Sequence, residues 1–406
     1  MKKVLIVSWY FAPCSRMGAK RFGVMCKYFK ENGYETYVIA APSLITSEGM
    51  EAGLEIPIPP EHIFEVNMDT SNMYFTSAIL VLLKKLKLCS RTIESLHFWY
   101  KNVKKEVDLV QLKNIGFDIV IGTYGPMANL YAAKYLSKKL KCKYIIDVRD
   151  FISDYKEKLP QGYRWASGLD YILEKISLHF SDGIVTVNPK MTKDMRKRYP
   201  RKKIITVYNG WDGWDVEQTE CLDNDSEKYL YFAGVLYEFT LDGLVLLFNA
   251  LRVVNEKEHI KMIIRCVGPQ KVKVKRMVRE MKMQEIVSCL PPVSEKVVEE
   301  ERRKAYMNVI FTALDKDNCN MVSIPGKTYE YMHEKAPVLG VTLRNSKLAQ
   351  ILKYTGKGIG SAVESEIVDF ILNADGKYEG NDNVLKFSRK YQASRLCRFM
   401  DYILDH

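Results

Sequence analysis

The feature that most restricts the fold is an order that repeats along the chain: a short apolar run, a glycine-bearing loop and a helix. The first copy has an apolar strand over 3–9, a loop that contains Gly18, a helix over about 19–32 and a second strand over 35–41. A continuously apolar strand is typical of a parallel sheet that is covered on both faces. Strand, loop, helix and strand in this order form a βαβ unit. The sequence therefore predicts an α/β protein.

The same order continues through the first half of the chain and starts again in the second half. A polar, aperiodic stretch separates the two series, and its length and position suit a chain of 406 residues that forms two domains. We expect two Rossmann-like βαβ domains that face each other across a cleft. The predicted bounds are 1–212 for the first domain, 213–228 for a linker, 229–385 for the second domain and 386–406 for a C-terminal helix that packs back on the first domain.

Two further expectations concern the less regular parts of the chain. Residues 44–72 are rich in proline and show no periodicity, which predicts irregular structure. The last helix is expected over about 384–404, with Phe387, Tyr391 and Leu396 on one side.

Composition limits the compartment and the kind of partner. The net charge of +12 suggests an anionic partner, which could be a membrane face, a nucleic acid or a phosphorylated substrate. The alternative is a soluble protein that happens to be basic. Nine cysteines include no C-x-x-C pair, so reduced thiols in a cytoplasmic protein are the simplest account. No run approaches the ~18 apolar residues that a spanning helix needs. No recognition-helix or RNA-binding signature accompanies the charge, so we expect no nucleic acid.

Residues 73–107 combine apolar, aromatic and basic side chains at helical spacing. A basic amphipathic helix with Phe98, Trp99 and Tyr100 could lie in a membrane interface, which predicts peripheral contact with the inner face of the membrane. The alternative is an ordinary helix that packs on its own domain and leaves its lysines in solvent.

The stretch over 320–340 carries the clearest chemistry. Pro325 and Gly326 precede a short helix, whose first free N–H groups and dipole favour an anion. Lys327 adds a positive charge there, and Glu330 lies about one helical turn further on. A nucleoside diphosphate beside a sugar with hydroxyls needs this set of groups. The alternative is a surface lysine and a solvated or capping carboxylate.

Loops at the carboxyl ends of the first domain's strands supply more candidates, because parallel sheets bind ligands at that edge. They include Asp147 and the segment around it, whose charges could instead form an arginine–aspartate ion pair that only shapes the loop. The candidates on this side are Arg16, Gly18, Lys20, Arg21, Tyr124, Arg149 and Asp150.

The chain resembles the retaining nucleotide-sugar glycosyltransferases of family 4 (group 1), which have the two-Rossmann GT-B fold. The resemblance spans nearly the whole chain. It rests on five segments, K-V-L-I-V-S-W-Y-F-A-P with the G-A-K-R that follows, D-V-R-D at 147–150, V-Y-N-G-W-D at 207–212, Y-F-A-G-V-L-Y at 231–237 and I-P-G-K-T-Y-E-Y-M from 324 onward.

The resemblance implies roles for individual residues. Glu330 would hold hydroxyls of the donor's ribose or sugar, and Asp150 would lie near the reacting sugar carbon, so these two are the implied catalytic residues. The loop at Gly18 would close against the phosphates, and Arg16, Lys20, Arg21, Tyr124 and Arg149 would line the acceptor side. The implied donor and nucleotide residues are Gly18, Gly234, Arg265, Pro291, Pro325, Gly326, Lys327 and Glu330.

Two departures from the family pattern affect the donor side. Val322 stands where many relatives have a first glutamate, and the segment 238–241 has neither the arginine nor the lysine that grips the diphosphate in many relatives. Lys327, or another basic residue such as Arg265, would then have to neutralise the phosphates. Asp315 and Asp317 imitate a metal-binding D-x-D pair but are interpreted as part of a polar loop. We expect no metal and no other cofactor besides the nucleotide sugar.

The predicted function is the transfer of a sugar, most likely from a UDP-linked donor, to a glycan or lipid-linked acceptor in surface polysaccharide or glycoconjugate biosynthesis. Two alternatives stay open. One is a two-Rossmann nucleotide-sugar epimerase, which would need no acceptor. The other is a degenerate, non-catalytic relative that acts as a partner protein.

Overall fold

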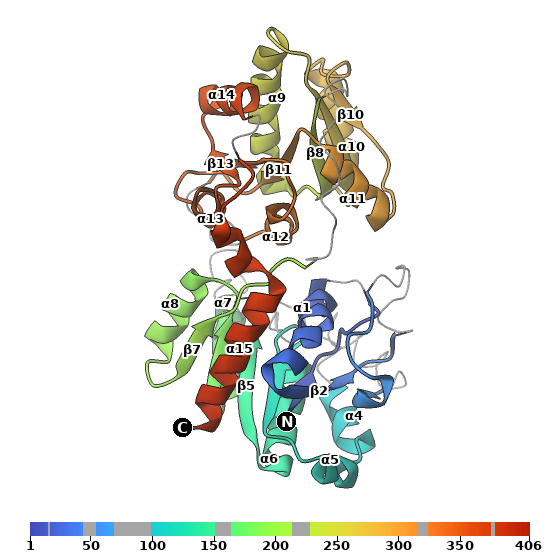
Figure 1. The fold of residues 1–406 in the computed structure, drawn as a ribbon, viewed down its shortest axis with the longest axis vertical. Coiled ribbons are helices and arrows are strands. Elements are labelled where there is room, and N and C mark those ends of the chain that lie inside the picture. Colours follow the sequence, from blue (N-terminus) through green and yellow to red (C-terminus); the bar gives the residue numbers. More distant parts are fainter. Residues whose placement is uncertain are drawn as a thin grey trace. The chain divides into compact units, whose positions relative to one another are not determined.

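A computed structural model describes residues 1–14, 17–43, 54–68, 99–150, 164–212, 228–315, 324–374 and 378–406. The chain forms two compact units, each built on its own parallel sheet (Figure 1). The first unit contains Met1–Asn209 together with Arg389–His406, and the second contains Gly210–Ser388.

The first unit has a seven-stranded sheet in the order β3-β2-β1-β4-β5-β6-β7. All its pairs are parallel, as shown by β1, in which Val4 is the partner of Thr36 on one side and of Ile119 on the other. The strands are β1 (Lys2–Val7), β2 (Tyr34–Ala40), β3 (Ile63–Glu65), β4 (Ile119–Thr123), β5 (Lys143–Val148), β6 (Gly183–Thr186) and β7 (Lys203–Thr206).

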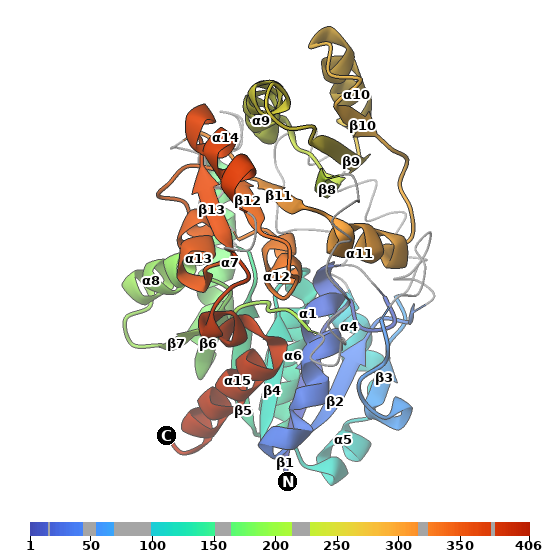
Figure 2. The same cartoon turned by 45° about the horizontal axis from the view of Figure 1, so that its top comes forward.

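Helices cover both faces of this sheet, which explains why its central strands β1 and β4 have long apolar runs. The α-helices of the first unit are α1 (Met17–Met25), α4 (Trp99–Glu106), α5 (Leu109–Ile115), α6 (Met127–Leu140), α7 (Arg164–His179), α8 (Pro189–Arg198) and α15 (Arg389–Leu404). Leu5 and Val7 of β1 point into a core that α4 and α6 complete. Val4 and Ile6 point into the opposite core, which α1 and α15 cover (Figure 2).

The second unit has a six-stranded parallel sheet in the order β10-β9-β8-β11-β12-β13. Its main core lies between the sheet and α9, α10 and α14. The strands are β8 (Tyr229–Val235), β9 (Lys261–Val267), β10 (Val287–Cys289), β11 (Met307–Phe311), β12 (Val338–Val341) and β13 (Gly358–Ser361). The helices are α9 (Leu241–Asn255), α10 (Lys271–Glu280), α11 (Glu295–Lys304), α12 (Gly326–Met332), α13 (Lys347–Thr355) and α14 (Glu364–Asn373).

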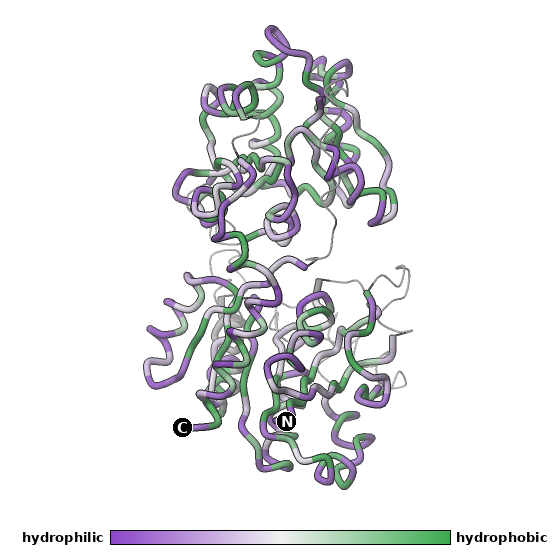
Figure 3. The backbone as a smooth tube through the Cα atoms, in the orientation of Figure 1, coloured by the Kyte–Doolittle hydropathy of each residue, from purple (hydrophilic) through white to green (hydrophobic). Residues whose placement is uncertain are grey.

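The predicted fold class is confirmed: the chain has two Rossmann-like α/β domains with parallel sheets. The C-terminal helix α15 also belongs to the first unit, where Phe399 packs against Gly183 of β6. In Figure 3 the buried strands are green, while the turn from α8 to β7 is purple.

Several local predictions were wrong. The helix expected over 19–32 ends at Met25 and continues as two 3₁₀ turns up to Gly33, whose φ of 84° closes the segment. The stretch 44–72 was expected to be irregular, but Ile63–Glu65 forms the edge strand β3. The last helix is interrupted, because residues 382–387 form a 3₁₀ turn before α15 begins. Phe387 of this turn and Leu396 of α15 are buried, whereas Tyr391 is exposed.

The segment 73–107 lies partly outside the described residues, which include only 99–107 of it. A membrane interface was one of two alternatives for Trp99, and its full burial favours the other, a helix that packs on its own domain. Its indole N–H donates to the Val66 carbonyl (2.9 Å), and its ring packs edge-on against Trp9 at 5.3 Å between centroids. Trp99 is therefore part of the first unit's core. Among the described residues, no helix has the length and apolarity that crossing a membrane requires.

Candidate functional site

The candidate site in the second unit begins with Lys327, the second residue of α12. Its Nζ lies 4.3 Å from the centre of the Phe232 ring, which belongs to β8. The amine also lies against the backbone of Gly234, since a Cβ placed on that glycine would be 1.8 Å from Nζ. Gly234 has a φ of 136°, a conformation that side chains rarely adopt. The glycine at the end of β8 thus makes the space into which Lys327 reaches.

The surroundings of Lys327 disfavour its charge. Burial lowers the pKa of the amine from 10.5 to about 8, although the negative charge of Glu330 opposes this effect. Within the described ranges, no carboxylate lies at ion-pair distance from Nζ. A desolvated cation of this kind gains free energy when an anion binds beside it. Perturbed groups of this type concentrate at functional sites.

Glu330 lies one turn further along α12 and is held by an arginine that sequence reasoning missed. Arg302 of α11 is only 8% exposed. Its Nη1 lies 3.7 Å from Glu330 Oε2, and its Nη2 lies 2.7 Å from Glu334 Oε1. The Glu330 side chain keeps 37% of its surface exposed, so its carboxylate is both oriented and accessible.

Arg265 and Pro291, two further predicted donor residues, contact each other. The Arg265 guanidinium donates to the Pro291 carbonyl (2.6 Å) and forms an ion pair with Glu301. The hydrogen bond from Arg265 is the main cause that lowers the pKa of Glu301, whose carboxylate also accepts from the Tyr231 hydroxyl (2.9 Å). The charge of Arg265 is therefore already neutralised inside the second unit.

In the first unit, Arg21 of α1 forms a buried ion pair with Asp147 at the end of β5. The Arg21 Nη2 is 2.7 Å from Asp147 Oδ1, and the two side chains are 2% and 1% exposed. Asp147 also accepts a hydrogen bond from the Thr123 hydroxyl (3.0 Å), and Arg21 Nη1 donates to Asn209 Oδ1 (3.0 Å). The pair joins α1, β4, β5 and the segment after β7.

Arg149 brings three of the predicted loops together. Its guanidinium donates to the carbonyl of Gly18 (3.0 Å), to that of Tyr124 (2.8 Å) and to that of Gly125 (3.1 Å). Burial lowers the pKa of Arg149, while the negative charge of Asp147 opposes that effect. Arg149 therefore holds the edge of the first sheet together through backbone carbonyls.

The remaining predicted residues of this edge differ in how exposed they are. Lys20 is partly buried on α1, and Asp150 is exposed just after β5. Arg16 and Val322 lie outside the described residues. Gly18 packs under the Tyr10 ring, since a Cβ on this glycine would be 2.9 Å from Tyr10 Cδ2.

Solved structures share this architecture over the whole chain. A glycosyltransferase from Rickettsia africae is 13% identical with a TM-score of 0.63, covering 100% of this chain and 99% of its own. HepE from Anabaena, solved in complex with UDP and glucose, is 12% identical with a TM-score of 0.55 and covers 100% and 98%. UDP-GlcNAc 2-epimerase from Methanocaldococcus jannaschii is 12% identical with a TM-score of 0.55 and covers 99% and 100%.

These similarities establish the two-domain GT-B architecture. No protein-family model matches this sequence, and no curated protein does. Neighbours at 10–13% identity identify the fold but not the reaction, which has to be inferred from the chemistry of the site.

Proposed function

We propose that this protein transfers a sugar from a nucleotide-sugar donor, with UDP as the nucleotide, to an acceptor hydroxyl. The observation that carries the proposal is the desolvated amine of Lys327, which lies against Gly234 and one helical turn from Glu330. A nucleoside diphosphate would place an anion beside this amine, which has no carboxylate at ion-pair distance among the described residues. Structural neighbours support the choice of nucleotide, because HepE was solved with UDP and the epimerases act on UDP-GlcNAc.

Lys327 would act on the leaving group. When the bond between the sugar carbon and the diphosphate oxygen breaks, its electron pair stays on the diphosphate, which gains negative charge. A cation already placed there stabilises the transition state more than the bound donor. Removing one such group typically costs on the order of 2.7–4 kcal/mol of transition-state stabilisation. Glu330 would accept hydrogen bonds from ribose or sugar hydroxyls, and Asp150 would lie near the reacting carbon.

The new bond joins the same sugar carbon to the acceptor oxygen. The acceptor's proton would pass to the departing phosphate, so that no side-chain base is needed, and configuration would be retained as in the family that the chain resembles. A glycan or lipid-linked acceptor fits the basic character of the chain, and we place the reaction in surface polysaccharide or glycoconjugate synthesis.

The test is a turnover assay with a panel of UDP-sugars, in which released UDP is measured with and without oligosaccharide acceptors. We expect UDP release that depends on acceptor and is accompanied by a new glycosidic product. UDP release and C2 epimerisation without any acceptor would identify an epimerase instead. Failure to bind UDP, GDP, ADP and CMP alike would favour a degenerate partner protein, a possibility that the internal pairing of Arg265 with Glu301 keeps open.

We also propose that the transfer needs no metal ion, because Lys327 would supply the positive charge at the diphosphate. The expected result is the same turnover rate in excess EDTA as in buffer alone. Loss of turnover in EDTA that manganese restores would contradict this part of the proposal.

A further inference from the structure

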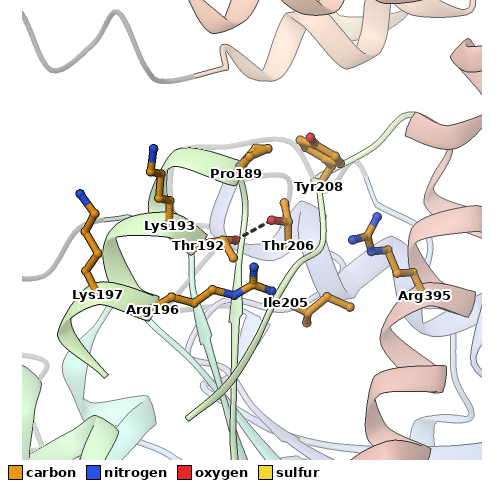
Figure 4. A pocket seen from close by; sticks show the side chains of 9 residues that line it. All are labelled: Pro189, Thr192, Lys193, Arg196, Lys197, Ile205, Thr206, Tyr208 and Arg395. Carbon is orange, nitrogen blue, oxygen red and sulfur yellow. Dashed lines mark hydrogen bonds between the residues drawn. The ribbon is translucent and has the colours of Figure 1, made fainter. Parts of the chain in front are cut away.

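A second concentration of positive charge lies in the first unit, in a pocket between α8, β7 and α15 (Figure 4). The pocket has a volume of about 730 Å³. Strand β7 is at the edge of its sheet, so the pocket borders the outermost strand. The side chains that line it are Pro189, Thr192, Lys193, Arg196, Lys197, Ile205, Thr206, Tyr208 and Arg395.

Four of these nine side chains are cations and none is a carboxylate. Arg196 extends from α8 and Arg395 from α15, so they approach Ile205 from opposite sides, while Lys193 and Lys197 stand on the outer side of α8 (Figure 4). Between the arginines lie the uncharged side chains of Thr192 and Thr206, whose hydroxyls are hydrogen-bonded to each other at 2.5 Å. Two arginines therefore flank the middle of the pocket, and two lysines form its rim.

The charge of this pocket is not balanced by its neighbours. Asp194 of the same helix is 2.5 Å from Lys190, and the buried Glu174 is 2.7 Å from Arg198. Arg196 donates to the Ile204 carbonyl (2.8 Å), which is a neutral partner. Across the part of the chain that the structure describes, no carboxylate pairs with Lys193, Lys197 or Arg395. Four positive charges thus border one pocket without compensation.

We propose that this pocket binds a phosphate-bearing ligand, as a site separate from the one at Lys327. Guanidinium groups match phosphate oxygens in a two-pronged geometry, and the structure leaves Arg395 available for such contacts. A single carboxylate would neutralise one of four charges, whereas a diphosphate or phosphate monoester carries about two or more. The volume also suits a small ligand, since binding pockets span roughly 300–1,000 Å³. The phosphate could belong to a lipid headgroup or to a soluble molecule.

The test uses inorganic pyrophosphate as the probe, titrated calorimetrically into the full chain carrying Lys327→Met. This background removes the amine of the proposed nucleotide site, so the two proposals succeed or fail separately. We expect pyrophosphate to bind, Arg395→Glu to weaken it by more than tenfold, and Lys193→Glu at the rim to weaken it severalfold. Neither residue has a carboxylate partner among the described residues, so both variants should unfold at the temperature of their parent.

Arg398→Glu is the matched control, because Arg398 is an exposed arginine of the same helix that does not line the pocket. It should change the pyrophosphate affinity by less than twofold. If Arg395→Glu and Arg398→Glu weakened pyrophosphate binding equally, the binding would depend on the overall surface charge and not on this pocket. That result would overturn the proposal. Absence of pyrophosphate binding in the Lys327→Met background would overturn it as well.

A vesicle arm identifies the source of the phosphate. If the wild-type chain floats with phosphatidylglycerol vesicles but not with phosphatidylcholine vesicles, and Arg395→Glu abolishes the flotation, the ligand is a lipid headgroup. If pyrophosphate binds and the chain floats with neither vesicle, the ligand is a soluble phosphate compound. Either result supports the pocket as a phosphate site.

Discussion

Basic side chains at the carboxyl edges of the two sheets can have opposite surroundings, as Arg21 and Arg149 of the first unit and Lys327 of the second unit show. In the first unit, Arg21 is paired with Asp147, and Arg149 donates to three backbone carbonyls. In the second unit, Lys327 lies over an aromatic ring and against Gly234, with a pKa lowered to about 8. Arg21 and Arg149 are thus neutralised or hydrogen-bonded by groups of their own unit, whereas burial disfavours the charge of Lys327.

This difference separates charges that build the fold from a charge that can bind a ligand. A buried polar group that already has its partners gains little from a ligand, whereas a desolvated group without an anion gains much. The difference also explains how one sequence pattern, a basic residue after a parallel strand, can have two meanings. The predictions below test it from the largest expected effect to the smallest.

The largest effect should come from Asp147→Asn, which leaves the Arg21 guanidinium buried without its counter-charge. Breaking a buried pair in this way costs about 3–5 kcal/mol of unfolding free energy. Urea unfolding followed by tryptophan fluorescence reports on this unit, because Trp9 and Trp99 are buried in its core. Asp150→Asn, at an exposed carboxylate, should change the free energy by less than about 0.5 kcal/mol. Equal effects of the two variants would mean that the pair does not hold this edge.

A smaller effect is expected from alanine at the two predicted site glycines. Gly234→Ala imposes a side chain at a φ of 136° and pushes the Lys327 amine aside, so it should cost about 1–3 kcal/mol and weaken UDP binding. At Gly18 the backbone is not left-handed, and the nearest atoms to an added Cβ belong to the Tyr10 side chain. Gly18→Ala should therefore cost less stability than Gly234→Ala. Thermal unfolding with and without UDP measures both quantities, and a larger loss at Gly18 would reverse the comparison.

The pH dependence of UDP binding tests whether the charge of the Lys327 amine holds the nucleotide. Its pKa of about 8 means that the amine carries its charge below that pH and loses it as the pH rises further. UDP affinity should therefore be constant from pH 7 to nearly 8 and then fall about tenfold per pH unit. Lys327→Arg stays charged throughout and should remove this fall. Calorimetric titrations from pH 7 to 9.5 would contradict the account if both proteins gave the same profile.

How much of this the sequence could predict depends on how local each feature is. The βαβ order was readable because the buried strands are apolar throughout and glycine follows several of them. The Lys327–Glu330 pair was readable because both residues lie on one turn of α12. Arg302 was not, because α11 brings it to Glu330 only through the fold. The same holds for the pairing of Arg265 with Glu301, which no spacing reveals.

Two other departures from the predictions have similar causes. Trp99 lies in a run that looks amphipathic, but the Val66 carbonyl and the Trp9 ring draw it into the core. The last helix is interrupted before Arg389, where Trp211 pairs with Ser388 and donates to the Phe387 carbonyl. Each of these contacts joins segments that are far apart in the chain, so local propensity gives no sign of them.

The most direct test of the central claim is the affinity of UDP for Lys327→Met compared with the wild-type chain, measured by calorimetry at pH 7. Methionine keeps most of the side chain's volume over Phe232 and removes only the charge. The account predicts at least a tenfold loss of affinity, together with an unfolding temperature in the absence of UDP that is equal to or higher than the wild-type value. Unchanged affinity in a folded Lys327→Met protein would contradict it, because the desolvated amine would then have no part in holding a nucleotide.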